Sequence, residues 1–77
     1  KESLENELIR RETLGSIQRF LDTLTPVERA VFVCRYWYLD NSKEIADKCG
    51  FSRGKVRTML RRTRIRLMDH LKKEGLA

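Results

Sequence analysis

The segment KEIADKCGFSRGKVRTM, residues 43–59, decides the fold because two patterns of helical spacing meet there at a short break. Ala46 is small enough for two helices to cross closely, and Gly50 follows four residues later in the break. Val56 and Met59 lie ten and thirteen residues after Ala46. This spacing predicts a helix-turn-helix. An ordinary hairpin of two helices is the alternative that the spacing leaves open.

Local signals mark the ends of both helices. Asn41 or Ser42 can cap the first helix, and Gly50 can end it in a left-handed backbone conformation. After the turn, Ser52 can cap the second helix. The expected ranges are 43–49 for the first helix, 53–73 for the second and about 42–73 for the whole motif.

Two more helices are expected before this motif. Thr25 can cap one of them, Pro26 fits its first position, and Glu28 completes a capping box. Before Thr25, apolar residues recur every three or four positions, as in an amphipathic helix. No strand pattern is present, so we predict a small all-α domain of four helices. The two upstream helices are expected over residues 4–24 and 26–38.

The core is expected where the apolar stripes of these helices meet. Its expected members are Leu14, Ile17, Leu21, Leu24, Val31, Ile45, Ala46, Phe51, Val56, Leu60 and Leu67. The helix over 26–38 is expected to turn inward Val27, Ala30, Val31 and Cys34, with Trp37 or Tyr38. Consecutive aromatic residues point in different directions on a helix, so they cannot form one flat platform for stacked bases. For Tyr36, Trp37 and Tyr38 we therefore expect packing at the core or its rim.

Size and composition exclude several classes of protein. A chain of 77 residues forms one domain with a thin core, which leaves no room for a large enclosed active site. Cys34, Cys49 and His70 are too few and too scattered for a zinc site, and no spacing of Ser, His and Asp indicates a catalytic triad. We therefore expect no enzyme activity, no metal and no cofactor.

The remaining compositional features concern location. No apolar run reaches the roughly 18 residues of a membrane span, and the charged amino end does not resemble a signal peptide. We expect a cytoplasmic protein in which Cys34 and Cys49 are reduced thiols. Because the chain begins with Lys1 rather than Met, we expect residues 1–77 to be a single-domain fragment of a longer protein.

Charge is distributed unevenly along the chain. Residues 1–47 hold seven basic and nine acidic side chains, whereas residues 48–77 hold ten basic and two acidic ones. Arginines are concentrated on the outward side of the last expected helix. Each pair of like charges at helical spacing destabilises a helix by roughly a few tenths of a kcal/mol. The same charges become favourable when phosphates approach and release counterions. This helix is therefore expected to enter the major groove of DNA.

Three stretches resemble the carboxyl-terminal promoter-recognition domain, region four, of bacterial RNA polymerase sigma factors. They are LTPVERAVFVCRYW (24–37), EIA (44–46) and GKVRTMLRRTRIRL (54–67). The resemblance extends over about residues 13–71 and looks most like the extracytoplasmic-function group. Two departures are Asp40-Asn41, where relatives usually have a glycine before the third helix, and Arg61, which is often apolar or small in relatives.

The resemblance implies sequence-specific binding to the minus-thirty-five promoter element in duplex DNA, and docking on the flap of the polymerase beta subunit. An anti-sigma factor is a further partner that the resemblance suggests. By the resemblance, Arg35, Ser42 and Lys43 align with phosphate contacts beside the groove. The part of the recognition helix that faces the groove aligns with Lys55, Arg57, Thr58, Arg61 and Arg62. Ser52 and Arg53, at the amino end of that helix, complete the expected DNA-binding set.

Some roles and classes stay open at this point. Arg35 has an alternative role as the ion-pair partner of Asp40 or Glu28, and Lys43 as a merely exposed side chain. Arg64 and Arg66 lie beyond the expected groove and are expected to be solvated or to touch the DNA backbone. A LuxR-type response-regulator output domain is the alternative among DNA-binding proteins, and a helical protein-interaction module is the alternative of another class.

Overall fold

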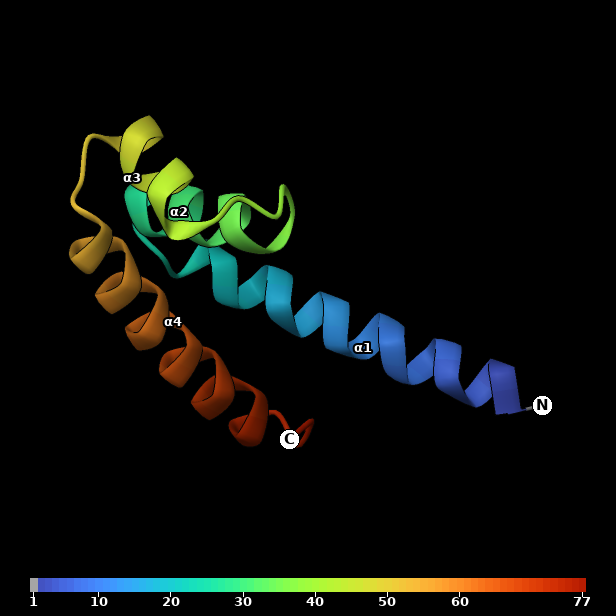
Figure 1. The fold of residues 1–77 in the computed structure, drawn as a ribbon. Helices are drawn as coiled ribbons and strands as arrows, with labels where there is room; N and C mark the ends of the chain where they lie inside the picture. Colours follow the sequence, from blue (N-terminus) through green and yellow to red (C-terminus); the bar gives the residue numbers. More distant parts are fainter. Residues whose placement is uncertain (1) are drawn as a thin grey trace.

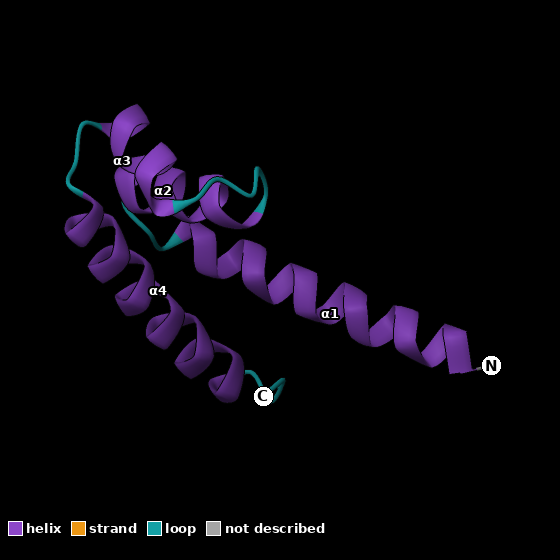
Figure 2. Cartoon of the chain, in the orientation of Figure 1, coloured by secondary structure: helices purple, strands orange, loops and turns teal. Residues whose placement is uncertain are grey.

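A computed structural model describes residues 2–77, with side chains from residue 4 onward. Four helices follow one another along the chain (Figure 1). They are α1 (Glu2–Asp22), α2 (Pro26–Tyr36), α3 (Ser42–Cys49) and α4 (Arg53–Lys73). The described part of the chain contains no strand, so the predicted all-α, four-helix class is confirmed (Figure 2). The limits of α4 agree with the prediction, whereas α1 and α2 each end two residues earlier than expected.

Side-chain caps fix the starts of α2 and α3. In α2, Thr25 Oγ1 accepts from the Glu28 amide at 3.2 Å, and Glu28 Oε1 accepts from the Thr25 amide at 2.9 Å. A second capping box joins Asn41 and Glu44 at 2.8 Å in both directions, which decides between the two caps proposed for α3 in favour of Asn41. Each cap stabilises its helix by about 1 kcal/mol.

The turn between α3 and α4 has the predicted geometry. Gly50 has φ 72°, in the left-handed region where a side chain is unfavourable, and it ends α3. The Phe51 amide then donates to the Ala46 carbonyl at 3.0 Å, and Ser52 Oγ accepts from the Lys55 amide at 3.1 Å. These bonds fix the direction in which α4 leaves the turn.

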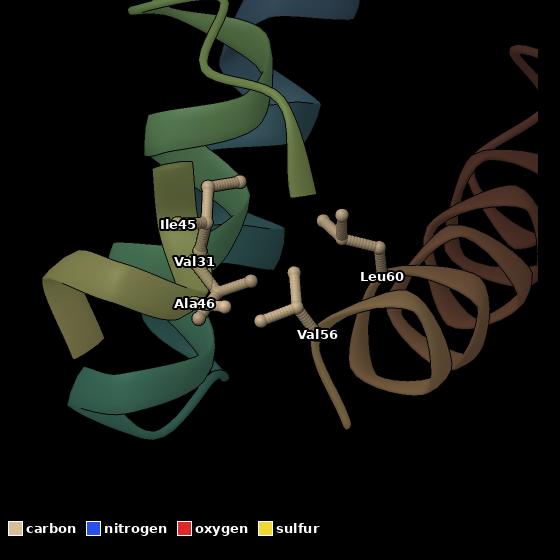
Figure 3. Packing of buried hydrophobic residues seen from close by; sticks show 5 residues of the cluster. All are labelled: Val31, Ile45, Ala46, Val56 and Leu60. Atoms are coloured by element: carbon tan, nitrogen blue, oxygen red, sulfur yellow. The ribbon is translucent and has the colours of Figure 1, made fainter. Parts of the chain in front are cut away.

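The core lies where α2, α3 and α4 meet. Val31 of α2 and the pair Ile45 and Ala46 of α3 face Val56 and Leu60 of α4 (Figure 3). Each of the five is at most 5% exposed. The half-buried residues Cys34, Cys49, Phe51 and Met59 pack around them. The helix-turn-helix is therefore held against α2 as one unit, which sets the direction of the outward face of α4.

Helix α1 joins this unit only through its carboxyl-terminal half. Phe20 is buried there, and the ring of His70 on α4 lies 5.5 Å from the Phe20 ring. His70 Nε2 donates to the Ser16 carbonyl at 2.9 Å, and Arg19 pairs with Glu74 at 2.6 Å. The Arg19 hydrogen bond lowers the pKa of the Glu74 carboxyl. The amino-terminal half of α1 projects away from the other helices (Figure 1).

Several burial predictions are wrong. Leu14 is 54% exposed because it lies close to the part of α1 that projects away from the other helices (Figure 1). Val27 is 48% exposed and Ala30 is also exposed, while Phe32, which was not expected in the core, is buried. The inward face of α2 is thus turned toward Phe32, because α2 packs against both α3 and α4. On α4, the expected core residues Val56 and Leu60 are buried and Leu67 is half-buried, and Thr63 is buried beside them.

The aromatic segment at the end of α2 also differs from expectation. Trp37 is 78% exposed and Tyr38 is 65% exposed, so neither belongs to the core. The helix ends at Tyr36, and the chain turns away there because Leu39 adopts a left-handed backbone with φ 60°. The left-handed residue in the loop before α3 is therefore Leu39.

Candidate nucleic-acid interface

A cleft of about 400 Å³ opens where the end of α2, the start of α3 and the outward side of α4 meet. Its lining contains four arginines and no acidic residue. The lining residues are Arg35, Ser42, Arg57, Thr58, Leu60, Arg61 and Arg64. Five of the ten predicted DNA-binding residues are therefore brought together here, although they come from three different helices.

Arg35 reaches this cleft from the last turn of α2. Its Nη1 donates to the Asp40 backbone carbonyl at 3.4 Å, and its Cζ lies 6.0 Å from the centre of the Tyr36 ring. Neither of its two proposed carboxylate partners is available, because Asp40 pairs with Lys48 at 2.6 Å and Glu28 pairs with a residue of α4. The bond to Asp40 raises the pKa of Lys48. Arg35 thus has no carboxylate partner within 4.0 Å among the described side chains.

The amino-terminal ends of α3 and α4 supply the other predicted phosphate contacts. Ser42 is the first residue of α3 and lines the cleft. Lys43 is exposed, and its Nζ lies 3.8 Å from Asp47, a loose pair in solvent. Ser52 Oγ accepts the capping bond of α4, so its hydroxyl hydrogen is free to donate. Arg53 follows it at the helix terminus, where backbone amides favour an anion.

The predicted residues of α4 are divided between two flanks of the helix. Arg57, Thr58 and Arg61 line the cleft, whereas Lys55 and Arg62 do not. At about 100° per residue, Arg62 lies about 140° around the helix from Arg57. Lys55 Nζ rests 4.2 Å from the centre of the Phe51 ring, a cation–π contact that holds it on the side of the turn.

Ion pairing distinguishes these basic residues from others on the same helix. Among side chains in residues 4–77, the basic residues of α4 up to Arg62 have no carboxylate oxygen within 4.0 Å. They are Arg53, Lys55, Arg57, Arg61 and Arg62. A surface of unpaired positive charge is therefore continuous with the cleft.

Arg64 and Arg66 are more specifically placed than the sequence indicated. Arg66 Nη1 pairs with Glu28 Oε2 of α2 at 3.2 Å. Arg64 Nη1 donates to the hydroxyl of Tyr36 at 3.0 Å and lines the cleft. The expectation that both were solvated or touched only DNA therefore missed an ion pair for Arg66 and a contact with Tyr36 for Arg64. Helical periodicity within α4 gives no signal for partners that lie 38 and 28 residues earlier in the chain.

A second hollow, of about 630 Å³, lies between α1, α2 and α4. We call it the apolar groove, because most of its lining is hydrophobic. Its lining residues are Leu14, Ile17, Gln18, Leu21, Phe32, Val33, Tyr36, Trp37, Arg64, Leu67, Met68 and Leu71. Leu14 and Trp37, two residues expected in or near the core, are thus exposed along an open groove.

A family model described as sigma-70, region 4, matches residues 14–67. The chain belongs to this family. The match spans α2, α3 and every predicted DNA-binding residue, and it ends within α4. No curated protein and no solved structure gives a significant match to the chain.

Membership of the sigma-70 region 4 family indicates the general function of the domain. The family binds promoter DNA and the RNA polymerase core, and it is a regulatory rather than a catalytic domain. The family match therefore favours the sigma interpretation over a LuxR-type output domain. Among the side chains of residues 4–77, no three His, Cys, Asp or Glu residues gather as metal ligands would. No helix in the same range combines the length and the apolar character of a membrane span.

Proposed function

We propose that this domain reads the minus-thirty-five element of duplex promoter DNA for a sigma factor of the extracytoplasmic-function-like group. The observation that carries the proposal is the cleft lined by four arginines and no acid, continuous with the unpaired basic side of α4. A protein that uses this surface for transcription initiation acts in the cytoplasm.

The two flanks of α4 suit the two walls of a major groove. The groove is about 12 Å wide and accepts one helix, so each flank of the helix faces one DNA strand. In the proposed complex, Arg57 and Arg61 face one strand together with the cleft, Arg62 and Lys55 face the other strand, and Thr58 lies between the two flanks. Arginine binds guanine O6 and N7 through two parallel hydrogen bonds. Arg57 and Arg62 are therefore the proposed base-reading residues.

Phosphate contacts position the helix in this arrangement. Arg35 and Ser42 line the cleft beside α4, and the exposed Lys43 directly follows Ser42 in the first turn of α3. Ser52 and Arg53 meet a phosphate at the amino terminus of α4, where backbone dipoles and side-chain charge act together. Such contacts give affinity for any duplex and fix the register in which the bases are read.

The apolar groove is the proposed docking surface for the flap of the polymerase beta subunit. It is built from α1, α2 and the second half of α4, whereas Arg57 and Arg61 line the other hollow. Trp37 is 78% exposed at its edge, and a large aromatic residue beside an apolar groove is typical of an interface anchor. An anti-sigma protein that occupied the same groove would exclude the flap.

Selection of binding sites from a random duplex pool by the protein with core polymerase tests the proposal. We expect the recovered duplexes to share one short sequence motif and to lose binding as the salt concentration rises. Recovery of unrelated sequences with equal affinity would contradict base reading by α4. A complex in which the flap covers Arg57 and Arg62 would contradict the assignment of the two surfaces.

A further inference from the structure

We propose that Arg64 is a further DNA-binding residue and that Tyr36 holds it in position. The inference rests on the proposed binding of duplex DNA by the cleft. It adds one contact beyond the residues that resemble the family's promoter-reading set, and it gives Tyr36 a role that neither core packing nor base stacking describes.

The position of Arg64 on α4 places it with the cleft arginines. Arg64 follows Arg57 by seven residues, which is about two helical turns, so the two side chains leave the helix within about 20° of each other. Both line the cleft, with Arg61 between them. The row formed by Arg57, Arg61 and Arg64 therefore extends the basic flank of α4 by one turn.

Tyr36 lines the apolar groove rather than the cleft, but it contacts two of the arginines that line the cleft. Its ring lies 4.7 Å from the ring of Phe32, which is buried, and Arg35 lies over it at 6.0 Å. From this position the Tyr36 hydroxyl accepts the hydrogen bond from Arg64 Nη1 at 3.0 Å. One tyrosine thus contacts two of the four arginines that line the cleft.

The kind of partner separates Arg64 from an arginine that serves stability. Arg66, two residues later, is neutralised by the Glu28 carboxylate at 3.2 Å. Arg64 is bound by a neutral phenol, which restricts the side chain but leaves its charge uncompensated. A guanidinium has five N–H donors, so one bond to Tyr36 leaves enough donors for a phosphate held by two parallel bonds.

This arrangement lowers the entropy that Arg64 loses when it binds. A free arginine side chain has many rotamers, and fixing one of them on a phosphate costs conformational entropy that opposes binding. The contact with Tyr36 restricts the side chain before DNA arrives. Tyr36 is therefore a positioning residue, and Arg64 is the residue that touches phosphate.

Salt-dependent binding of the full chain to a selected duplex and to a scrambled one tests this proposal. Arg64→Gln is expected to weaken binding to both duplexes by about five- to tenfold and to lower the salt slope by about one unit. Arg64→Lys should restore the slope but only part of the affinity, because lysine keeps the charge and loses the planar fork. The matched control is Arg66→Gln, which removes the same charge from the same helix and should leave the slope unchanged.

Tyr36→Phe tests the positioning role, because it removes only the hydroxyl and keeps the ring against Phe32. We expect Kd to rise about two- to fivefold with an unchanged salt slope, and no further rise when Tyr36→Phe is added to Arg64→Gln. Thermal unfolding of each variant checks that the fold is intact. An unchanged Kd and slope for Arg64→Gln would overturn the proposal, as would equal losses from Tyr36→Phe with and without Arg64.

Arg57→Ala separates this inference from the proposed function. If Arg57→Ala reduces the preference for the selected duplex while Arg64→Gln has no effect, the proposed base reading by α4 is supported and the proposed role of Arg64 is contradicted. If the wild-type chain binds no duplex, both the proposed function and the proposed role of Arg64 are contradicted.

Discussion

In the first half of α4, the basic side chains from Arg53 to Arg62 have no carboxylate partner among the described residues, whereas in the second half several basic groups lie near one. Arg66 pairs with Glu28, His70 lies 3.8 Å from Glu74, and Lys73 pairs with Asp69. The two halves carry similar residue types on one continuous helix. The two halves therefore differ in whether their basic side chains have carboxylate partners, not in the kinds of residue that they carry.

The largest expected effect lies in the first half. Changing Arg57 or Arg62 to Ala should reduce affinity for the selected duplex by about 1–3 kcal/mol and reduce discrimination among bases, because each residue is placed to read a base edge. Affinity for selected and scrambled duplexes measures both effects. Equal losses of affinity on both duplexes would mean that α4 attracts DNA only through its charge and reads no bases. The two halves of α4 would then differ only in unpaired charge.

A second large effect is expected where α3 crosses α4. Ala46 is 5% exposed in the core, so Ala46→Leu should overpack the crossing and lower the free energy of unfolding by about 1–3 kcal/mol. Chemical denaturation measures the change. This substitution should also weaken DNA binding, because the crossing with α3 fixes the orientation of the first half of α4. Unchanged stability would show that the crossing is looser than the close contact described above.

A smaller effect is expected at Lys43, which lies outside α4. Lys43→Ala should weaken binding to all duplexes alike and lower the salt slope by about one unit, because the residue meets phosphate and not a base. Titrations over a range of salt concentrations measure the slope. A loss confined to the selected duplex would assign Lys43 to base reading and extend the reading surface beyond the first half of α4.

The smallest effect is expected for the ion pair between Glu28 and Arg66 in the second half of α4, and it concerns how stability depends on pH. The pKa of Glu28 is lowered mainly by the hydrogen bond from the Thr25 amide, and also by the charge of Arg66. A lowered pKa in the folded state stabilises the fold above the ordinary value of 4.5, and this contribution disappears as pH falls through the folded value.

Glu28→Gln keeps an oxygen for the capping bond and removes the charge. It should lower the free energy of unfolding at pH 7 by less than about 1 kcal/mol, because the pair is partly exposed to solvent. The difference from wild type should vanish in strong acid, and DNA affinity should stay unchanged. Unfolding curves at several pH values measure the first effect. A loss of DNA affinity at pH 7 would assign the Arg66 pair to the DNA-binding part of the helix.

The features predicted well from the sequence are those that neighbouring residues determine. The capping box of Thr25 and Glu28, the left-handed Gly50 and the cap at Ser52 each depend on contacts within a few positions, and all three are confirmed. The spacing from Ala46 to Met59 likewise indicated the crossing of α3 and α4. Local signals were therefore sufficient for the motif and for the limits of α4.

The features missed depend on how separate helices approach one another. Burial of Phe32 and exposure of Leu14 depend on the direction in which α1 leaves the domain, and periodicity within one helix contains no such information. Trp37 is exposed because α2 ends before it. The bond between Arg64 and Tyr36 joins residues 28 positions apart, so charge and spacing in α4 alone could not indicate it.

Arg64 lines the cleft and also the apolar groove, and Tyr36 lines the groove while holding Arg64. The two surfaces thus share one hydrogen bond. If Arg64 binds DNA as proposed, a ligand of the groove that strengthens or breaks this bond changes the affinity for DNA, and thermodynamic reciprocity requires DNA to change the affinity for that ligand by the same factor. In a sigma factor, recruitment by polymerase and engagement of the promoter would then be energetically coupled within a single domain of 77 residues.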